Sequence, residues 1–225
     1  MSAPRAAAPS GVVTFLFTDI EGSTRRWEAD ADAMRVALAA HDELLRTAIE
    51  GHGGWLFKHT GDGVCAAFAS PRCAVDAAVA AQRALQLPVR MSIATGEAEL
   101  RGADYFGPVL NRAARIMAAG HGGQILLAES TAGLLSGVDL LDLGTHELRD
   151  LPRPQRVVQL CHPDLRNDFP PLRSPKSVGA HNLPVQLTSF VGRGAQMTDL
   201  EKLLVDNRLG EPDRRRRCRQ DPSRR

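Results

Sequence analysis

The pattern of apolar and polar positions in the first half of the chain predicts alternating strands and helices. A run of mostly apolar residues over 13–20 is typical of a buried strand, and apolar residues at helical spacing follow from Met34 to Leu45. Two short β runs, WLFKH and VCAAF, flank the sequence TGDG, which predicts a hairpin with a glycine-bearing turn. An alanine-rich helix that begins at Pro71 and an alternating strand over 89–96 complete the order β-α-β-β-α-β.

This order is the ferredoxin-like plan, an α+β fold in which helices cover one face of an antiparallel sheet. Beyond it, the sequence predicts a helix over 108–119, a strand at QILLA, a short helix capped by Ser130 and a β region over 139–160. We therefore expect a ferredoxin-like βαββαβ fold with extra α/β elements at its C-terminal end.

Changes in composition divide the chain into four segments. Residues 1–11 are expected to be a flexible N-terminus, and residues 12–161 one folded domain. Residues 162–184 are rich in proline, asparagine and serine without periodicity, which predicts a linker. Residues 185–225 begin like another domain, with leucines on one helical face, and then turn into an arginine-rich tail. We interpret this last segment as the truncated remnant of a following domain, with a basic tail that is expected to be disordered.

Composition indicates a globular protein that works inside the cell. Hydrophobic residues make up 43% of the 225 positions, which is enough for a core. No apolar run reaches the length of about eighteen residues that a membrane-spanning helix needs. Because the N-terminus lacks the apolar segment of a secretion signal, we expect a cytoplasmic protein without a membrane partner. The four cysteines show no CxxC spacing, which argues against a zinc site or a disulfide framework.

The net charge of +2 conceals an uneven distribution. Residues 207–225 hold eight arginines against three acidic residues, whereas the rest of the chain holds 20 basic against 23 acidic residues. The part that is expected to fold is therefore mildly acidic, and its charge gives no reason to propose nucleic-acid binding. A basic arm for nucleic acid or acidic lipid is the alternative interpretation of the tail.

Two aspartates suggest a cation site. Asp19 ends the first predicted strand, where an isolated carboxylate would be costly to bury, and Asp62 lies in the predicted hairpin turn. Adjacent first and second strands of a ferredoxin-like sheet would bring both carboxylates to one edge, where they could hold a pair of divalent cations. The plainer alternative is that Asp19 caps a helix beginning near Ser23 and that Asp62 is an ordinary turn residue.

Further polar residues stand at spacings that favour the cation site. Lys58 precedes Asp62 by four residues in KHTGDG. In DYFGPVLNRAAR, Asp104 stands ahead of a predicted helix that carries Asn111 and Arg115 at i and i+4 on one face. With its motifs FTDIEGST, KxxGDG, DYxGxxxNxAAR and LGTHELRDL, the sequence resembles the class III adenylate cyclase catalytic domain.

The resemblance covers roughly residues 12–160 and implies a metal site. Asp19 and Asp62, with the backbone carbonyl of Ile20, would bind two Mg²⁺ or Mn²⁺ ions. One ion would activate the ribose 3′-hydroxyl for attack on the α-phosphate, and the other would hold the phosphates of the leaving pyrophosphate. Glu21 belongs to the same motif but is expected to support or cap this site and not to bind metal.

The resemblance also implies the substrate. Lys58 and Asp104 match the pair that selects the purine: adenine offers an acceptor at N1 for the lysine and a donor at N6 for the carboxylate. Guanine presents the opposite pattern, so ATP is the predicted substrate. Asn111 matches the residue that orients the ribose, and Arg115 the one that stabilises charge on the transferring phosphate.

The resemblance further implies a head-to-tail homodimer. In the family, the metal-binding aspartates of one chain face the base-selecting and Asn/Arg residues of another, so a monomer should be inactive. The predicted activity is the conversion of ATP to 3′,5′-cyclic AMP and pyrophosphate by a two-metal mechanism. A catalytically weak ATP-binding regulatory module and a guanylate cyclase are the alternatives.

A second resemblance concerns the end of the chain. The segment NLPVQLTSFVGR is similar to the start of the ATPase domain in large bacterial transcriptional regulators that carry an N-terminal cyclase domain. In those proteins a P-loop follows soon after, whereas here the arginine-rich tail follows. The resemblance implies that the chain is a truncated descendant of such a regulator.

Overall fold

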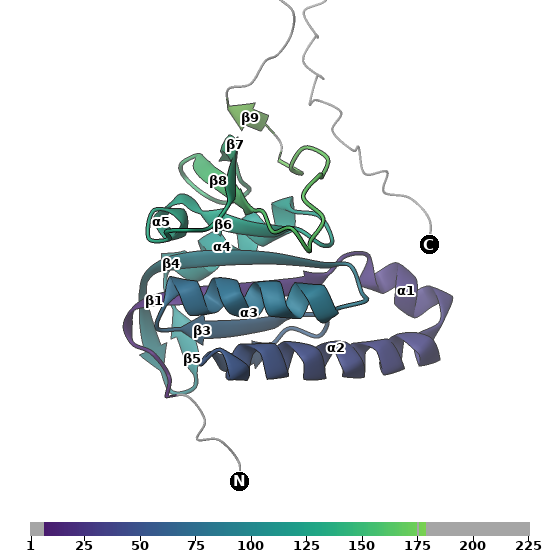
Figure 1. Cartoon of the computed structure of the whole chain (residues 1–225). Coiled ribbons are helices and arrows are strands. Elements are labelled where there is room, and N and C mark those ends of the chain that lie inside the picture. The colour runs from purple at the N-terminus through teal and green to yellow at the C-terminus, as the bar shows by residue number, and fades with distance from the viewer. Residues whose placement is uncertain (1–6, 175, 179–225) are drawn as a thin grey trace, which may run out of the picture. The chain divides into compact units, whose positions relative to one another are not determined.

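The computed structural model describes residues 7–174 and 176–178. The predicted remnant and basic tail over 185–225 lie outside the described residues. The same holds for residues 1–6 of the predicted flexible N-terminus and for residues 175 and 179–184 of the predicted linker. Figure 1 shows that the described residues combine helices with a twisted sheet.

The helices and strands follow the sequence prediction closely. Both hairpin strands and the helix over 108–119 begin and end at the predicted residues, whereas the strand predicted over 89–96 continues to Arg101. In chain order, the elements are β1 (Gly11–Ile20), α1 (Ser23–Ala29), α2 (Ala31–Gly51), β2 (Trp55–His59), β3 (Val64–Phe68), α3 (Pro71–Ala84), β4 (Val89–Arg101), β5 (Asp104–Phe106), α4 (Pro108–Ala119), β6 (Ile125–Ala128), α5 (Glu129–Ala132), β7 (Leu140–Glu147), β8 (Gln155–Leu160) and β9 (Lys176–Val178).

The strands pair in the order β2-β3-β1-β4-β6-β8-β7-β9, and β5 pairs with β4. β2, β3, β1 and β4 are antiparallel neighbours, which confirms the predicted ferredoxin-like βαββαβ unit. β6 joins β4 in parallel, and the later strands extend the sheet as the predicted C-terminal addition. One detail of the prediction is wrong, since the first strand lies beside the third and fourth strands and not beside the second. The connection from β1 through α1 and α2 leads to β2, which is not adjacent to β1 in the sheet. β3 lies between these two strands.

The two faces of the sheet carry separate buried clusters. Alternate residues of β1 face opposite sides, as the geometry of a strand requires. Leu16 and Ile20 pack with residues of α2 and α3, whereas Phe15 and Phe17 pack with residues of α4 (Figure 1). Asp19 follows Phe17 by two residues, so its side chain lies on the same face of the sheet, which is the face that α4 covers.

Helix α2 shows the amphipathic pattern that the sequence predicted. Its buried residues Met34, His41, Leu45 and Ile49 follow helical spacing. The predicted cap at Ser130 is wrong, because α5 begins after Ala128 without a side-chain cap. The Ser130 hydroxyl instead donates to the Thr95 carbonyl at 2.9 Å and so ties α5 to β4.

Residues 162–174, which we call the strap, lie against the domain although the sequence places them in a linker. Leu165 packs against the cluster beside α2 and α3, and Leu172 against the cluster beside α4. The Arg173 backbone N–H donates to the Ala119 carbonyl at 2.9 Å. The strap has no periodicity because its contacts come from single side chains and backbone groups. The domain boundary near Cys161 stays a prediction.

Within residues 7–174 and 176–178, no helix has the length and apolar character needed to cross a membrane.

Candidate active site

The structure brings Asp19, Ile20 and Asp62 to one edge of the sheet. Asp19 and Ile20 end β1, and Asp62 lies in the turn between β2 and β3. Because β3 pairs with β1, this turn closes over the end of β1, and the Ile20 N–H donates to the Asp62 carbonyl at 3.1 Å. The three groups that the sequence assigned to a metal site are therefore neighbours.

Gly63 permits this close approach. A Cβ atom at Gly63 would lie 1.9 Å from the Thr18 carbonyl oxygen, so no side chain fits between the turn and β1. The Thr18 hydroxyl also accepts a hydrogen bond from the Val64 N–H at 3.0 Å. The second glycine of the GDG sequence thus sets the spacing between the two aspartates.

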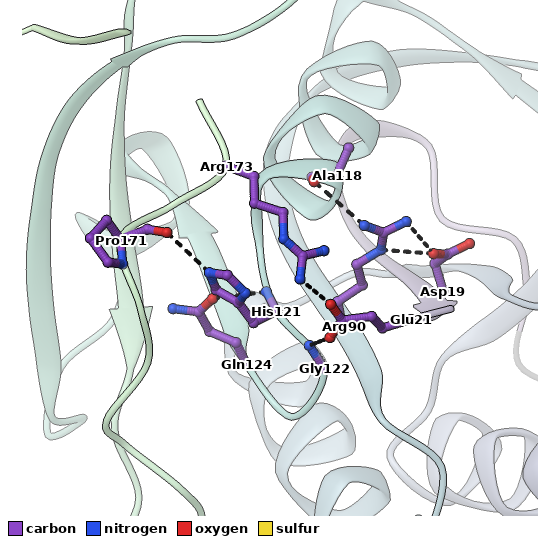
Figure 2. Close-up of polar contacts among 9 residues, drawn as sticks. All are labelled: Asp19, Glu21, Arg90, Ala118, His121, Gly122, Gln124, Pro171 and Arg173. Carbon is purple, nitrogen blue, oxygen red and sulfur yellow. Dashed lines mark hydrogen bonds and ion pairs between the residues drawn. The ribbon is translucent and has the colours of Figure 1, made fainter. Parts of the chain in front are cut away.

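Each aspartate carboxylate is held by one side chain. Arg90, which lies opposite Asp19 in the β1–β4 pairing, donates from Nε to the Asp19 Oδ2 at 2.7 Å, and its Nη2 forms an ion pair with the same oxygen at 2.6 Å (Figure 2). The Ser23 hydroxyl at the start of α1 donates to Oδ2 of Asp62. Asp19 therefore does not cap α1, whose N-cap residue is Gly22 without a side-chain hydrogen bond.

The electrostatics of this edge fit a divalent cation. Burial raises the pKa of Asp19, and the neighbouring Asp62 carboxylate raises it further, against the lowering effect of Arg90. Two carboxylates and a backbone carbonyl are the hard oxygen donors that Mg²⁺ and Mn²⁺ prefer. In the described part of the chain, no group of three or more His, Cys, Asp or Glu side chains could hold a metal ion. Water molecules or the oxygens of a ligand would complete the coordination of an ion held here.

Lys58 and Asp104 form a second group, with Nζ of the lysine 2.6 Å from Oδ2 of the aspartate. The hydrogen bond between them raises the pKa of Lys58 and lowers that of Asp104, so both groups carry their charges at neutral pH. The two side chains lie on different hairpins, β2 and β5, and tertiary structure alone brings them together.

A β-bulge puts Lys58 on the correct face. Leu56 pairs with Ala66 and Lys58 with Cys65, so two residues of β2 oppose one residue of β3. Cys65 belongs to the cluster beside α4, and its partner Lys58 faces the same side. Without the bulge, strict alternation would turn Lys58 toward α2 and α3.

Aromatic rings support the Lys58–Asp104 pair. The Tyr105 ring, which follows Asp104 in the chain, lies 5.0 Å from both Phe15 and Phe57 by ring centroids, with edge-to-face geometry. Trp55 joins the same group at 5.6 Å from Tyr105. Such packing fixes β2 against β5 and leaves the charged ends at the rim of an apolar platform.

Asn111 and Arg115 lie on α4, as predicted, four residues apart. Asn111 is exposed, and Arg115 donates from Nη2 to Oδ2 of Asp150 at 2.5 Å. Nε of Arg115 is buried and has no hydrogen-bond partner among the described residues. Asp150 has a φ of 59°, a left-handed conformation that is uncommon for a residue other than glycine.

The predicted site residues therefore form three groups on one chain. Asp19, Ile20 and Asp62 make the first group, Lys58 and Asp104 the second, and the α4 residues the third. Among residues 7–174 and 176–178, no hydrogen bond or ion pair connects one group with another. The structure adds Arg90, Ser23 and Asp150, which sequence reasoning missed because only strand register and chain folding place them beside their partners.

Sequence comparison finds both adenylate cyclases and uncharacterised proteins among the relatives. Residues 6–159 match the family model described as the adenylate and guanylate cyclase catalytic domain. An uncharacterised protein of Mycobacterium tuberculosis is 44% identical over 199 residues, which cover 84% of this chain and 70% of that protein. A receptor-type adenylate cyclase of Trypanosoma brucei brucei is 32% identical over 215 residues, which cover 71% of this chain but only 17% of that protein.

Solved structures show the same fold. A Trypanosoma brucei adenylate cyclase, determined in its monomeric state, superposes with a TM-score of 0.68 at 31% identity and covers 78% of this chain and 99% of that chain. A protein of Silicibacter pomeroyi described as an adenylate/guanylate cyclase/hydrolase superposes with a TM-score of 0.60 at 28% identity, covering 66% of this chain and 95% of that chain.

Proposed function

The chain belongs to the family of adenylate and guanylate cyclase catalytic domains, and we propose that it converts ATP to 3′,5′-cyclic AMP and pyrophosphate. In this proposal, Lys58 and Asp104 select ATP over GTP. Their side chains meet at 2.6 Å above an aromatic platform, one as a donor and the other as an acceptor. Adenine inserted between them accepts from Lys58 at N1 and donates to Asp104 from N6.

The metal-binding part of the proposal rests on Asp19, Asp62 and the Ile20 carbonyl, which would hold two Mg²⁺ or Mn²⁺ ions. When bound, these ions lower the pKa of the ribose 3′-hydroxyl and neutralise the triphosphate. The raised pKa of Asp19 beside Asp62 supports this assignment, because a cation relieves the repulsion between two neighbouring carboxylates.

In the proposed reaction, the 3′-oxygen gives its proton to water and bonds to the α-phosphorus. The bond between the α-phosphorus and its bridging oxygen breaks, and pyrophosphate leaves with that oxygen. Arg115 stabilises the charge that develops on the transferring phosphate, and Asn111 orients the ribose. To do so, Arg115 has to exchange its present partner, Asp150, for the phosphate.

We also propose a head-to-tail homodimer, because no hydrogen bond or ion pair joins the three groups of site residues within the described part of one chain. In the dimer, the metal-binding group of one chain faces the purine-binding pair and α4 of the other chain. Two such sites would form, related by a twofold axis.

The first experiment measures cyclic nucleotide formation by the full chain with Mn²⁺ or Mg²⁺, given ATP and GTP in separate reactions. We expect cyclic AMP from ATP, little product from GTP, and loss of activity in the Asp62→Asn variant. The control is Asp76→Asn, an exposed aspartate on α3 that pairs with Arg72 away from the site and should leave activity unchanged. Equal turnover of both nucleotides would refute the assigned substrate.

A regulatory module that binds ATP without turnover is the second candidate. Lys58 and Arg115 both hold a carboxylate of their own chain, and these ion pairs favour a resting state. A dimer that binds ATP in the presence of Mn²⁺ but releases no cyclic AMP would support this candidate.

Residues 185–225 are, in our proposal, the remnant of a following ATPase domain, as in large bacterial regulators. The resemblance of NLPVQLTSFVGR to the start of such a domain supports this origin. Sequencing the gene across and beyond this segment tests it, because a remnant predicts a P-loop coding sequence in another reading frame.

A further inference from the structure

Glu21, which directly follows the proposed metal ligands Asp19 and Ile20, is held by two parts of the chain. Its Oε2 accepts from the Gly122 N–H at 2.6 Å, and its Oε1 accepts from Nη2 of Arg173 (Figure 2). The Glu21 backbone N–H donates to the Pro88 carbonyl at 2.8 Å. Glu21 therefore fastens the turn between β1 and α1 to the segment before β6 and to the strap.

Arg173 is itself fixed in place. Its backbone N–H donates to the Ala119 carbonyl at 2.9 Å, and the preceding residue, Leu172, packs into the cluster beside α4. One residue further back, the Pro171 carbonyl contacts Nε2 of His121 at 3.1 Å (Figure 2). The guanidinium thus reaches Glu21 from an anchored backbone.

The contact is charged and partly sheltered. Arg173, followed by the Gly122 N–H, lowers the pKa of Glu21, so the carboxylate is ionised at neutral pH. The exposed fractions of the two side chains are 30% for Glu21 and 44% for Arg173. Gly122 has no room for a side chain, since a Cβ there would lie 2.5 Å from the Cβ of Pro88. The backbone donor is therefore held close to Glu21.

We call the sheet edge formed by Asp19, Ile20 and Asp62 the metal edge. The turn that Glu21 holds in place carries two groups at this edge. Ile20, whose carbonyl is a proposed ligand, immediately precedes Glu21. Ser23, which donates to Asp62, follows it by two residues. A shift of Glu21 would move both groups, and Asp19 and Asp62 would lose their common geometry.

We propose that Arg173 is a positioning residue that acts through Glu21 to hold the turn between β1 and α1 in the geometry that binds divalent cations. This inference rests on the proposed function, because it assigns the metal edge to Asp19, Ile20 and Asp62. Arg173 lies outside residues 6–159, which match the family model, so the strap adds a support to the catalytic domain from beyond that match.

The test measures the affinity of the full chain for Mn²⁺ by electron paramagnetic resonance of the free ion, without nucleotide. Removing the partner of a group that supports metal ligands typically weakens metal affinity by about 10–100-fold, and we expect about tenfold for Arg173→Ala. Arg173→Lys keeps a cation and should retain most of the affinity. The matched control is Arg166→Ala in the same strap, whose guanidinium lies 4.7 Å over the Phe169 ring and does not reach Glu21.

A second variant removes the charge of Glu21 and keeps the size of its side chain. Glu21→Gln keeps an acceptor for the Gly122 N–H but loses the ion pair, so it should weaken Mn²⁺ binding as Arg173→Ala does. The combination of both changes should add little to either one. Wild-type affinity in Arg173→Ala, or an equal loss in Arg166→Ala, would overturn the inference.

The same measurement distinguishes this inference from the proposed function. Mn²⁺ binding requires no turnover, so a chain that binds Mn²⁺ but makes no cyclic AMP refutes the cyclase activity and leaves the role of Arg173 supported if Arg173→Ala weakens binding. A wild-type chain that binds no Mn²⁺ without nucleotide overturns the inference about Arg173, whereas the proposed function is then decided by cyclic AMP formation from ATP and Mn²⁺.

Discussion

At the level of single residues, the proposed purine-binding pair, Lys58 and Asp104, is already joined by an ion pair without substrate. Lys58 and Asp104 neutralise each other at 2.6 Å, and Arg115 is paired with Asp150 at 2.5 Å. Under the proposed function, adenine would therefore replace the Lys58–Asp104 ion pair, and phosphate would replace the Arg115–Asp150 ion pair. Because the side chains of these pairs are 34% to 59% exposed, their replacement costs far less than breaking a fully buried pair.

Exchanging the two purine-binding charges should change the preferred nucleotide. In the double variant Lys58→Glu with Asp104→Lys, the carboxylate faces N1–H of guanine and the lysine faces O6, while the ion pair itself is kept. We expect the ratio of kcat/KM for ATP to that for GTP to fall at least about tenfold, the effect of one well-placed hydrogen-bonding group. Steady-state kinetics with both nucleotides measure this ratio.

The control for the exchange is Glu99→Gln, on the same hairpin as Asp104. Glu99 pairs with Arg101 at 2.8 Å and is largely exposed, so its loss should leave the nucleotide preference unchanged. A double variant that keeps the ATP preference of the wild type would show that other groups select the purine.

Among the elements, the β2–β3 hairpin determines whether Asp62 lies beside Asp19 and Ile20. Its turn approaches β1 so closely that a Cβ at Gly63 would lie 1.9 Å from the Thr18 carbonyl oxygen. The bulge between Leu56 and Lys58, on strand β2 of the same hairpin, turns the Lys58 side chain toward the face that α4 covers. One short hairpin therefore positions both Asp62, the proposed metal ligand, and Lys58, the proposed partner of the base.

Gly63→Ala should push the turn away from β1. We expect the free energy of unfolding to fall by about 1–3 kcal/mol, the usual cost of forcing extra atoms into a packed site, together with weaker Mn²⁺ binding. Chemical denaturation and metal titration measure the two effects.

The comparison variant is Gly51→Ala at the end of α2. A Cβ at Gly51 meets no atom within 4 Å, so this change should leave Mn²⁺ binding unaltered and stability within about 1 kcal/mol of the wild type. Full metal affinity in Gly63→Ala would mean that the turn can move without disturbing the aspartates.

For the whole molecule, the separation of the three groups predicts that two chains share each site. Asp62→Asn removes the metal-binding group and Arg115→Ala removes the phosphate-stabilising group, so each variant alone should be inactive. A mixture of the two contains mixed dimers in which one of the two sites has all its residues. Random pairing should restore about a quarter of the wild-type activity.

The readout for this mixture is cyclic AMP formation after the two purified variants are combined and allowed to exchange subunits. The control mixes Asp62→Asn with Asp19→Asn, which lie in the same group and should not restore activity. An Asp62→Asn and Arg115→Ala mixture that is no more active than this control would contradict a shared site.

The sequence by itself determined much of this protein. Apolar periodicity predicted the ferredoxin-like unit and its C-terminal extension, because each element buries one face and the period of burial is local. Position and spacing singled out Asp19, Asp62 and the other polar residues of the three groups, and the family resemblance added the Ile20 carbonyl, although their chemical roles stay predictions.

Only the tertiary structure decided how distant residues meet. Arg90 faces Asp19 through strand register, Lys58 reaches Asp104 through a bulge, and the strap returns Arg173 to Glu21 across more than half of the chain. These contacts depend on where separate elements pack, and local spacing carries no information about that. For the same reason, the composition of the strap predicted a linker, whereas single side chains and backbone hydrogen bonds hold it against the domain.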